Sequence, residues 1–124
     1  MKRTTILAAI AVTGTAAAAL AHSGATGIVK ERMEAMKAMG DAVKTVTPMM
    51  QGEAEYDADV MRDAARTFQE HSGEALTELF PEGSDGAPSE AKDVIWSDWE
   101  RFEELARLLD VYGEGLEGAA GNGM

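Results

Sequence analysis

One stretch of the chain carries apolar residues at the spacing of a long helix, and this spacing limits the fold more than any other feature. The pattern runs from 26 to 50 in steps of three and four, through Val29, Met33, Met36, Gly40, Val43, Thr47 and Met50. A broad stripe of this kind is typical of an amphipathic helix packed in a bundle. Pro48 should end or bend this helix, because proline lacks a backbone donor and clashes with the preceding turn.

Two later segments keep the same helical period. A second helix is predicted over 58–79, with Asp57 as its cap, because a carboxylate can accept hydrogen bonds from free backbone donors. A third helix is predicted to start at the capping box SDWE, residues 97–100, and to run to about 116. Glycines should weaken its end. Residues 118–124 show no core-forming pattern.

A long connection rich in proline and glycine, residues 80–88, separates the second and third helices, and Phe80 is expected to hold it down. The sequence shows no strand pattern and no internal repeat. A length of 124 residues suits one domain. We therefore predict an all-α fold. Three helices can form a bundle, but four are the commoner solution.

The N-terminal residues have the features of an export signal. A short basic start precedes an apolar, alanine-rich run over 6–20, and Ala19-Leu20-Ala21 fits the small-x-small pattern of a signal-peptidase site. We expect a signal peptide over 1–21, cleavage after Ala21, a helical domain over 22–124 and a periplasmic location. A transmembrane anchor is the weaker alternative, because the run is shorter than the roughly 20 residues that a span needs.

Acidic residues outnumber basic ones by 22 to 11, which gives the chain a formal net charge of −11. Such a surface should repel nucleic acid and anionic lipid, so we expect neither nucleic acid nor, after signal cleavage, a membrane as partner. A cationic partner suits it better. The chain has no cysteine, which excludes disulfides. A small exported protein then depends on a good core or a bound cofactor.

Four short stretches resemble the cytochrome c-prime family. They are VKERMEAM at 29–36 in the first helix, GEAEYDA at 52–58 in the first loop, FPEGS at 80–84 in the long connection, and IWSD at 95–98, followed by Phe102, at the start of the third helix. Each stretch alone is weakly specific. They occur in the family's order with nearly the family's spacing, and together they cover residues 29 to about 116.

The resemblance implies an up-and-down four-helix bundle of exported haem proteins, of which this chain holds three helices. In the family, a fourth helix carries Cys-x-x-Cys-His, whose thiols attach haem c and whose histidine is the proximal iron ligand. No such motif is present in this sequence. We expect a cytochrome truncated before that helix, with an open face that lowers stability. A relative that has given up covalent haem is the alternative.

The resemblance also places Met36 at the family's distal position, facing the open side of the haem iron. A methionine there can be the sixth iron ligand, which raises the potential and suits one-electron transfer in a low-spin protein. A leucine or an aromatic residue at this position would instead indicate gas binding. Without the resemblance, Met36 would be interpreted as core filler, which is the usual role of methionine on a helix seam.

Five further residues are placed around the haem by the resemblance. Arg32, one turn before Met36, would lie near a propionate, which a guanidinium suits well. Composition alone would make Arg32 a solvated surface charge. Met33 and Glu90 would lie at the haem edge. Phe80 and Phe102 would form walls of the pocket, although plain core packing predicts their burial equally well.

A haem-free copper-binding protein is the alternative function. After cleavage, His22 would provide an amine and an imidazole, which copper(II) prefers, and methionine sulfurs bind copper as well. Met33, Met36 and Met39 spread over an arc of about 120°, however, so they do not converge on one point. His71, the other histidine, is expected to face solvent. A haem-free structural or interaction bundle is a third interpretation.

We expect no enzyme activity. No serine, histidine and acid are placed for nucleophilic catalysis, and no glycine-rich phosphate loop follows a strand. The predicted function is one-electron transfer in a periplasmic c-type cytochrome. Its expected partner is a cationic redox protein, and a homodimer is compatible with the sequence.

Overall fold

The computed structural model describes residues 25–124, so the predicted signal peptide and His22 lie outside the described residues. All regular secondary structure in this part of the chain is helical, which confirms the all-α prediction. The helices are α2 (Gly27–Met50), α3 (Ala58–Glu70), α4 (Gly73–Thr77), α5 (Val94–Ser97) and α6 (Trp99–Ala119), followed by the 3-10 turn η1 (Ala120–Asn122). No helix within residues 25–124 combines the length and apolar character that a membrane crossing requires.

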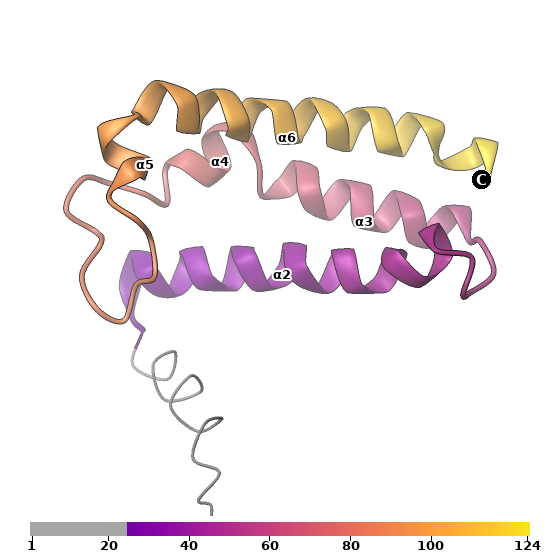
Figure 1. Cartoon of the computed structure of the whole chain (residues 1–124), viewed down its shortest axis with the longest axis horizontal. Coiled ribbons are helices and arrows are strands. Elements are labelled where there is room, and N and C mark those ends of the chain that lie inside the picture. Colours follow the sequence, from indigo (N-terminus) through magenta and orange to yellow (C-terminus); the bar gives the residue numbers. More distant parts are fainter. Residues whose placement is uncertain (1–24) are drawn as a thin grey trace, which may run out of the picture.

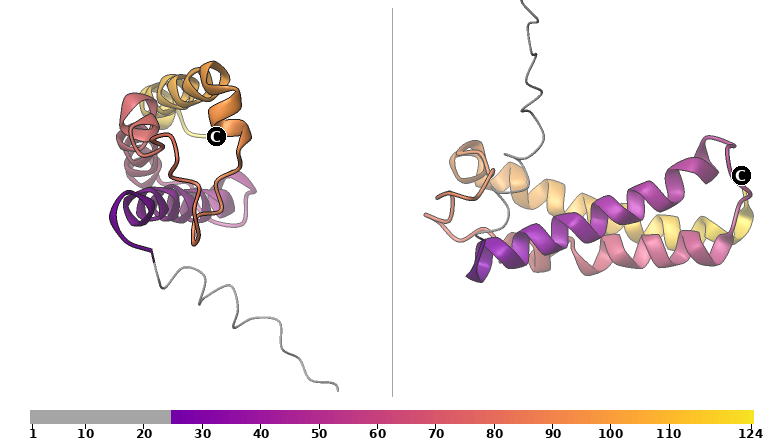
Figure 2. Two further views of the ribbon diagram at one scale, coloured as in Figure 1. Left: turned by 90° about the vertical axis from the view of Figure 1, so that its left-hand side faces the viewer. Right: turned by 90° about the horizontal axis from the view of Figure 1, so that it is seen from below.

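The three long helices run up, down and up beside one another (Figure 1). α3 packs against both α2 and α6, whereas α2 and α6 make little direct contact with each other. Seen end-on, they occupy three corners of a bundle, and no helix of residues 25–124 occupies the fourth (Figure 2, left). This is the arrangement expected of an up-and-down four-helix bundle of which three helices are present.

The first helix ends close to where Pro48 predicts. Pro48 lies inside α2, and the helix stops two residues later at Met50. The carbonyl of Pro48 then accepts hydrogen bonds from the amides of Glu53 (2.8 Å) and Ala54 (3.1 Å), which closes the turn that leads to α3. Pro48 has no amide hydrogen to donate to the carbonyl of Lys44, so the last turn of the helix lacks one hydrogen bond.

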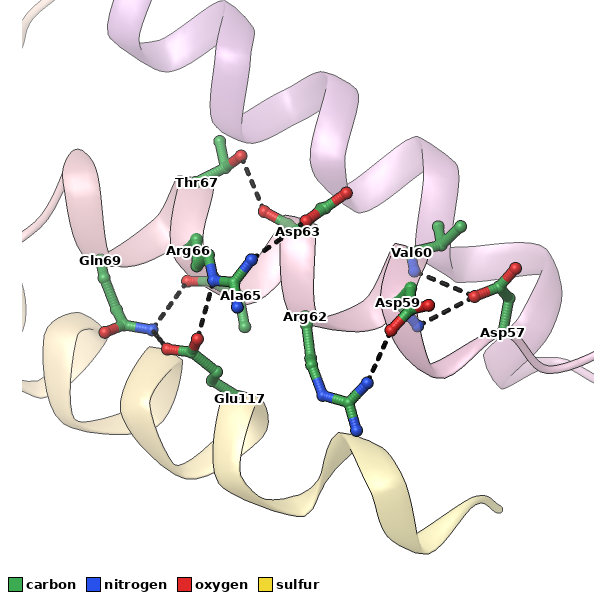
Figure 3. Close-up of polar contacts among 10 residues, drawn as sticks. All are labelled: Asp57, Asp59, Val60, Arg62, Asp63, Ala65, Arg66, Thr67, Gln69 and Glu117. Carbon is green, nitrogen blue, oxygen red and sulfur yellow. Dashed lines mark hydrogen bonds and ion pairs between the residues drawn. The ribbon is translucent and has the colours of Figure 1, made fainter.

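The prediction of one continuous second helix is wrong, because this segment forms two helices, α3 and α4. The Asp57 cap is confirmed: its carboxylate accepts from the amides of Asp59 (2.9 Å) and Val60 (3.1 Å), as Figure 3 shows. The helix then breaks after Glu70 instead of running to 79. At the break, Gly73 has a φ of 54°, and the buried hydroxyl of Ser72 donates to the carbonyl of Gln69. Glycine adopts this left-handed conformation without steric cost, so the chain can change direction here.

The predicted capping box is also wrong. Ser97 is the last residue of the short helix α5, and its hydroxyl donates back to the carbonyl of Val94 (3.4 Å). α6 therefore begins two residues later, at Trp99, without a side-chain cap. The sequence pattern was correct for a helix start, but α5 already uses the serine that the box requires.

The end of the third helix is firmer than its glycines predict. α6 continues through Gly113, Gly115 and Gly118 to Ala119. At Gly113 an added Cβ would lie 2.9 Å from Cγ of Gln69 and 3.3 Å from the carbonyl oxygen of Ala65. The missing side chain at this position therefore allows α6 to approach α3 closely.

The C-terminal segment, which shows no core-forming pattern, nevertheless belongs to a core. Ala120 is only 1% exposed and packs with Met49 and Met61 at the far end of the bundle. The hydroxyl of Tyr56 donates to the carbonyl of Ala120 at 2.6 Å, which ties this segment to the loop before α3. The prediction failed because the burial of Ala120 comes from partners more than 50 residues away.

A second core lies at the opposite end, near the long connection. It is built on Leu76, Phe80 and Ala106, with the aromatic rings of Trp96, Trp99 and Phe102 packed around them. The rings of Phe80 and Phe102 meet edge to face at 4.8 Å between centroids. The indole nitrogen of Trp96 donates to the carbonyl of Phe80 at 3.0 Å, so Trp96 anchors the start of the connection.

Two helices expose apolar stripes. On α2, Met36, Val43 and Met50 are 41%, 50% and 53% exposed and are spaced seven residues apart, which places them on one face. On α6, Leu105 and Tyr112 have the same spacing and are 47% and 67% exposed. A helix in a bundle normally buries such a stripe against a neighbour.

Candidate functional site

A pocket of about 1090 Å³ opens at the start of α2, at the same end of the molecule as the aromatic core. One wall is the first three turns of α2, and the other is formed by residues 88–91 of the connection together with Ile95. Phe80 lines the pocket as well. A volume of this order suits a cofactor-sized ligand.

Five of the six predicted site residues line this pocket. They are Arg32, Met33, Met36, Phe80 and Glu90. Phe102 does not line it. Phe102 instead stands behind Phe80, against whose ring it packs, so it supports the wall without facing the pocket. The structure thus gathers residues that are up to 58 positions apart in the sequence.

The three methionines of α2 have different surroundings. Met33 and Met36 line the pocket, and Met36 is 41% exposed. Met39 does not line it and packs against the core of Leu76, Phe80 and Ala106. The thioether sulfurs that a ligand in the pocket could meet are therefore those of Met33 and Met36.

Arg32 is almost completely buried, with an exposed fraction of 4%, and is not the solvated charge that composition favours. Its Nη1 donates to the Leu79 carbonyl (3.2 Å) and the Ser84 hydroxyl (3.0 Å). Its Nη2 donates to the Ser84 carbonyl (2.7 Å) and the Ser89 hydroxyl (2.8 Å). The guanidinium carbon also lies 4.5 Å from the centre of the Phe80 ring, which is a cation–π distance. Burial lowers the pKa of Arg32.

Other charges at the pocket are exposed. Lys30 pairs with Glu34 at 3.6 Å, and Lys37 pairs with Asp41 one turn further along α2. Such solvent-exposed pairs contribute little to stability. The hydrogen bond from Lys37 is the main reason that the pKa of Asp41 is lowered.

Sequence reasoning missed the serines that bind Arg32. Ser84 was noted only as part of the connection, and Ser89 was not singled out. A loop serine carries no periodic signal, and the buried position of Arg32 follows from its place on the inner face of α2. The lining contribution of Ile95 and Ala91 was missed for the same reason.

The chain matches known cytochromes. A family model described as Cytochrome C′ matches residues 27–124. The chain belongs to the cytochrome c′ family. This confirms the resemblance found in the sequence. The three long helices are therefore those of a c-type cytochrome.

Individual relatives are similar over part of their length. The cytochrome c′ of Rhodopseudomonas palustris (strain ATCC BAA-98 / CGA009) is 30% identical over 94 residues, which are 75% of this chain and 64% of the relative. A cytochrome c-556 of Agrobacterium tumefaciens (strain B2A) is 32% identical over 83 residues, or 67% of this chain and 66% of the relative. The cytochrome c′ of Pararhodospirillum photometricum is 34% identical over 76 residues, or 60% and 59%. This chain thus spans less than two thirds of these relatives, and no solved structure matches it significantly.

The family implies haem c, and the residues of this cytochrome fit one face of that group. The pocket offers an apolar wall, the ring of Phe80 and the two thioethers of Met33 and Met36. They do not fit covalent attachment or proximal ligation. The chain has no cysteine, and the pocket lining contains no histidine. Within residues 25–124, no group of three or more histidine or carboxylate side chains could hold a metal.

Proposed function

We propose that this chain forms the distal part of a periplasmic c-type cytochrome that carries single electrons. The observation that supports this most is the position of Met36. A methionine on a helix seam is usually buried in the core, whereas Met36 lines an open, mostly apolar pocket at the site that the family resemblance predicts. It has the right chemistry and access for a distal ligand.

When bound, haem c would supply a one-electron couple between ferric and ferrous iron. The residues of this chain would set the reduction potential of the haem and shield it from water. The soft sulfur of Met36 would favour the reduced iron, and Met33 and Phe80 would present apolar surface that keeps water away. Glu90 lies at the exposed rim, and Phe102 holds Phe80 in place from behind.

Attachment of haem c in the manner of the family requires a Cys-x-x-Cys-His segment that these 124 residues do not contain. The exposed stripes of α2 and α6 support such a segment as a fourth helix. Met36 belongs both to the stripe of α2 and to the pocket, so a helix covering the stripe would lie beside the pocket.

The nucleotide sequence after the codon for Met124 tests this requirement. We expect a reading frame that encodes Cys-x-x-Cys-His shortly beyond that codon. A genuine stop codon with no such frame downstream would contradict covalent haem attachment. It would favour the haem-free alternatives for this chain.

Reduction potentials test the role of Met36 in the protein that carries its attachment helix. Because a thioether stabilises ferrous iron, Met36→Leu should lower the potential. Met39→Leu is the matched control, since Met39 packs in the core and should leave the potential nearly unchanged. Equal potentials for the wild type and Met36→Leu would show that Met36 is not a ligand.

The partner we propose is a cationic redox protein, because the net charge of −11 would attract it at long range. Association should therefore weaken as salt is added. The copper alternative has less support from the pocket, because Met39 packs away from the other two methionines.

A further inference from the structure

Among residues 25–124, Arg32 makes the only polar contacts between α2 and the loop that forms the opposite wall of the pocket. Within residues 25–124, its bonds to Leu79, Ser84 and Ser89 are the only hydrogen bonds that join α2 to residues 79–93. No ion pair in this part of the chain joins the two segments. The placement of the connection over the pocket therefore depends on one side chain.

The four donors on the terminal nitrogens of Arg32 are all used by the protein. Each terminal guanidinium nitrogen carries two hydrogens, and each makes two hydrogen bonds. All four acceptors are neutral carbonyl or hydroxyl oxygens, and no carboxylate of residues 25–124 pairs with Arg32. An anion that approached the two terminal nitrogens would have to displace bonds that are already made at 2.7–3.2 Å.

One of these acceptors, Ser89, also takes part in a hydrogen bond within the loop that forms the wall. The hydroxyl of Ser89 accepts from Arg32 and, at 3.1 Å, from the amide of Ala91. Pro88, Ser89, Glu90 and Ala91 all line the pocket. Phe80, whose ring lies against the guanidinium, lines it too. Arg32 thus contacts the loop wall at Ser89 and the base of the pocket at Phe80.

We infer that Arg32 is a positioning residue, which ties residues 79–91 to α2 and so fixes the width and shape of the pocket. This role is distinct from the propionate contact that the family resemblance implies. The inference does not depend on which group the pocket holds. It can therefore be tested independently of the proposed electron-transfer function.

Lysine is the informative substitution. Arg32→Lys keeps the positive charge but replaces a planar fork of two terminal nitrogens with one nitrogen, which cannot reach both sets of oxygens. If position 32 needs only a charge, lysine should suffice. If it needs to tie the loop to α2, lysine should fail almost as badly as Arg32→Met.

Amide hydrogen exchange on the full chain measures the loop directly. Arg32→Lys and Arg32→Met should both speed exchange at residues 84–91 by about tenfold or more, because hydrogen bonds to a charged group are lost. Exchange in α3 should change less than about twofold. Ser89→Ala, which removes one acceptor and is less disruptive to folding, should speed exchange in the same segment. Arg66→Lys, at an exposed arginine of α3, is the control and should leave residues 84–91 unchanged.

Methionine methyl signals in carbon-13 NMR spectra give a readout that general destabilisation would not produce. Arg32→Lys should shift the signals of Met33 and Met36, which line the pocket, and leave those of Met49 and Met61 in the far core unchanged. The inference is overturned if Arg32→Lys matches the wild type in both measurements while Arg32→Met does not. It is also overturned if neither substitution changes the exchange of residues 84–91.

Discussion

At the scale of single residues, position on a helix decides what chemically equal side chains do. Met33, Met36 and Met39 follow one another in steps of three, yet two line the pocket and one packs in the core. Met61, on α3, is 2% exposed and is the largest fully buried side chain of residues 25–124. A ligand in the pocket can therefore meet the sulfurs of Met33 and Met36 but not that of Met39.

Truncation of a buried methionine should destabilise the protein strongly. Met61→Ala should lower the free energy of unfolding by about 2–5 kcal/mol, because it removes apolar contacts and leaves a cavity. Met50→Ala, at a residue 53% exposed, should change it by less than about 1 kcal/mol. Urea unfolding of the two variants measures the difference, and equal losses would show that Met61 is not a core residue.

At the scale of elements, the contact between α3 and α6 is specified by both packing and polar groups. Glu117 of α6 accepts from Arg66 Nε and Gln69 Nε2 of α3, each at 2.8 Å (Figure 3). A few residues away, Gly113 allows the close approach of the two helices. These interactions fix the register of α6 against α3.

Two glycines of α6 should respond oppositely to the same substitution. Gly113→Ala should destabilise the protein, because its Cβ would meet Gln69 Cγ at 2.9 Å and backbone of Ala65 at 3.3 Å. Gly115→Ala has no atom within 4 Å of the new Cβ and should stabilise by about 0.5–1 kcal/mol through helix propensity. Thermal unfolding of both variants checks the signs, and a stabilised Gly113→Ala would mean that α6 lies further from α3.

Acid should weaken the contact at Glu117. The hydrogen bond from Gln69, and then that from Arg66, lowers the pKa of Glu117 in the folded protein. Its stabilising contribution is therefore fully present above the unfolded value, about 4.3, and is lost as pH falls through the lower folded value. Glu117→Gln should flatten the fall in stability below about pH 4.3, whereas Glu114→Gln, an exposed neighbour, should not. Identical pH profiles for Glu117→Gln and the wild type would contradict this linkage.

The sequence predicts elements well where local signals decide them. Periodicity located the three long helices, and the carboxylate of Asp57 marked the start of α3. It failed at Ser72, where a buried hydroxyl and Gly73 turn the chain within a continuous apolar pattern, and at Ser97, which α5 uses before α6 can. It also failed at Ala120, whose burial depends on Tyr56. At Ser72 and Ser97 a hydrogen bond to the carbonyl three residues back accompanies the break in the pattern, and at Ala120 a tertiary contact outweighs it.

The candidate site was predictable only through the family resemblance. No periodic signal separates Met36 from Met39, and the sequence alone favours core packing for both. The resemblance groups residues of α2 with Phe80 and Glu90 around the haem, and these residues line one pocket. It carried no information on the four neutral oxygens that surround Arg32, because these lie in a connection that has no regular structure.

At the scale of the whole molecule, three helices leave one side of the bundle with exposed apolar stripes on α2 and α6. The chain should therefore bind an apolar fluorescent dye while folded. The double variant Val43→Gln and Leu105→Gln should reduce this binding with little loss of helix content, because both side chains are about half exposed. Undiminished dye binding would mean that the exposed surface lies elsewhere.

The spectrum of the oxidised protein, loaded with haem on its attachment helix, tests the assignment of Met36 most directly. We predict a low-spin, six-coordinate iron in the wild type and in Met39→Leu, whose side chain packs in the core. Met36→Leu should give a high-spin, five-coordinate iron, because its side chain cannot ligate. A high-spin wild type, or a Met36→Leu variant that stays low-spin, would contradict the assignment of Met36 as the distal ligand.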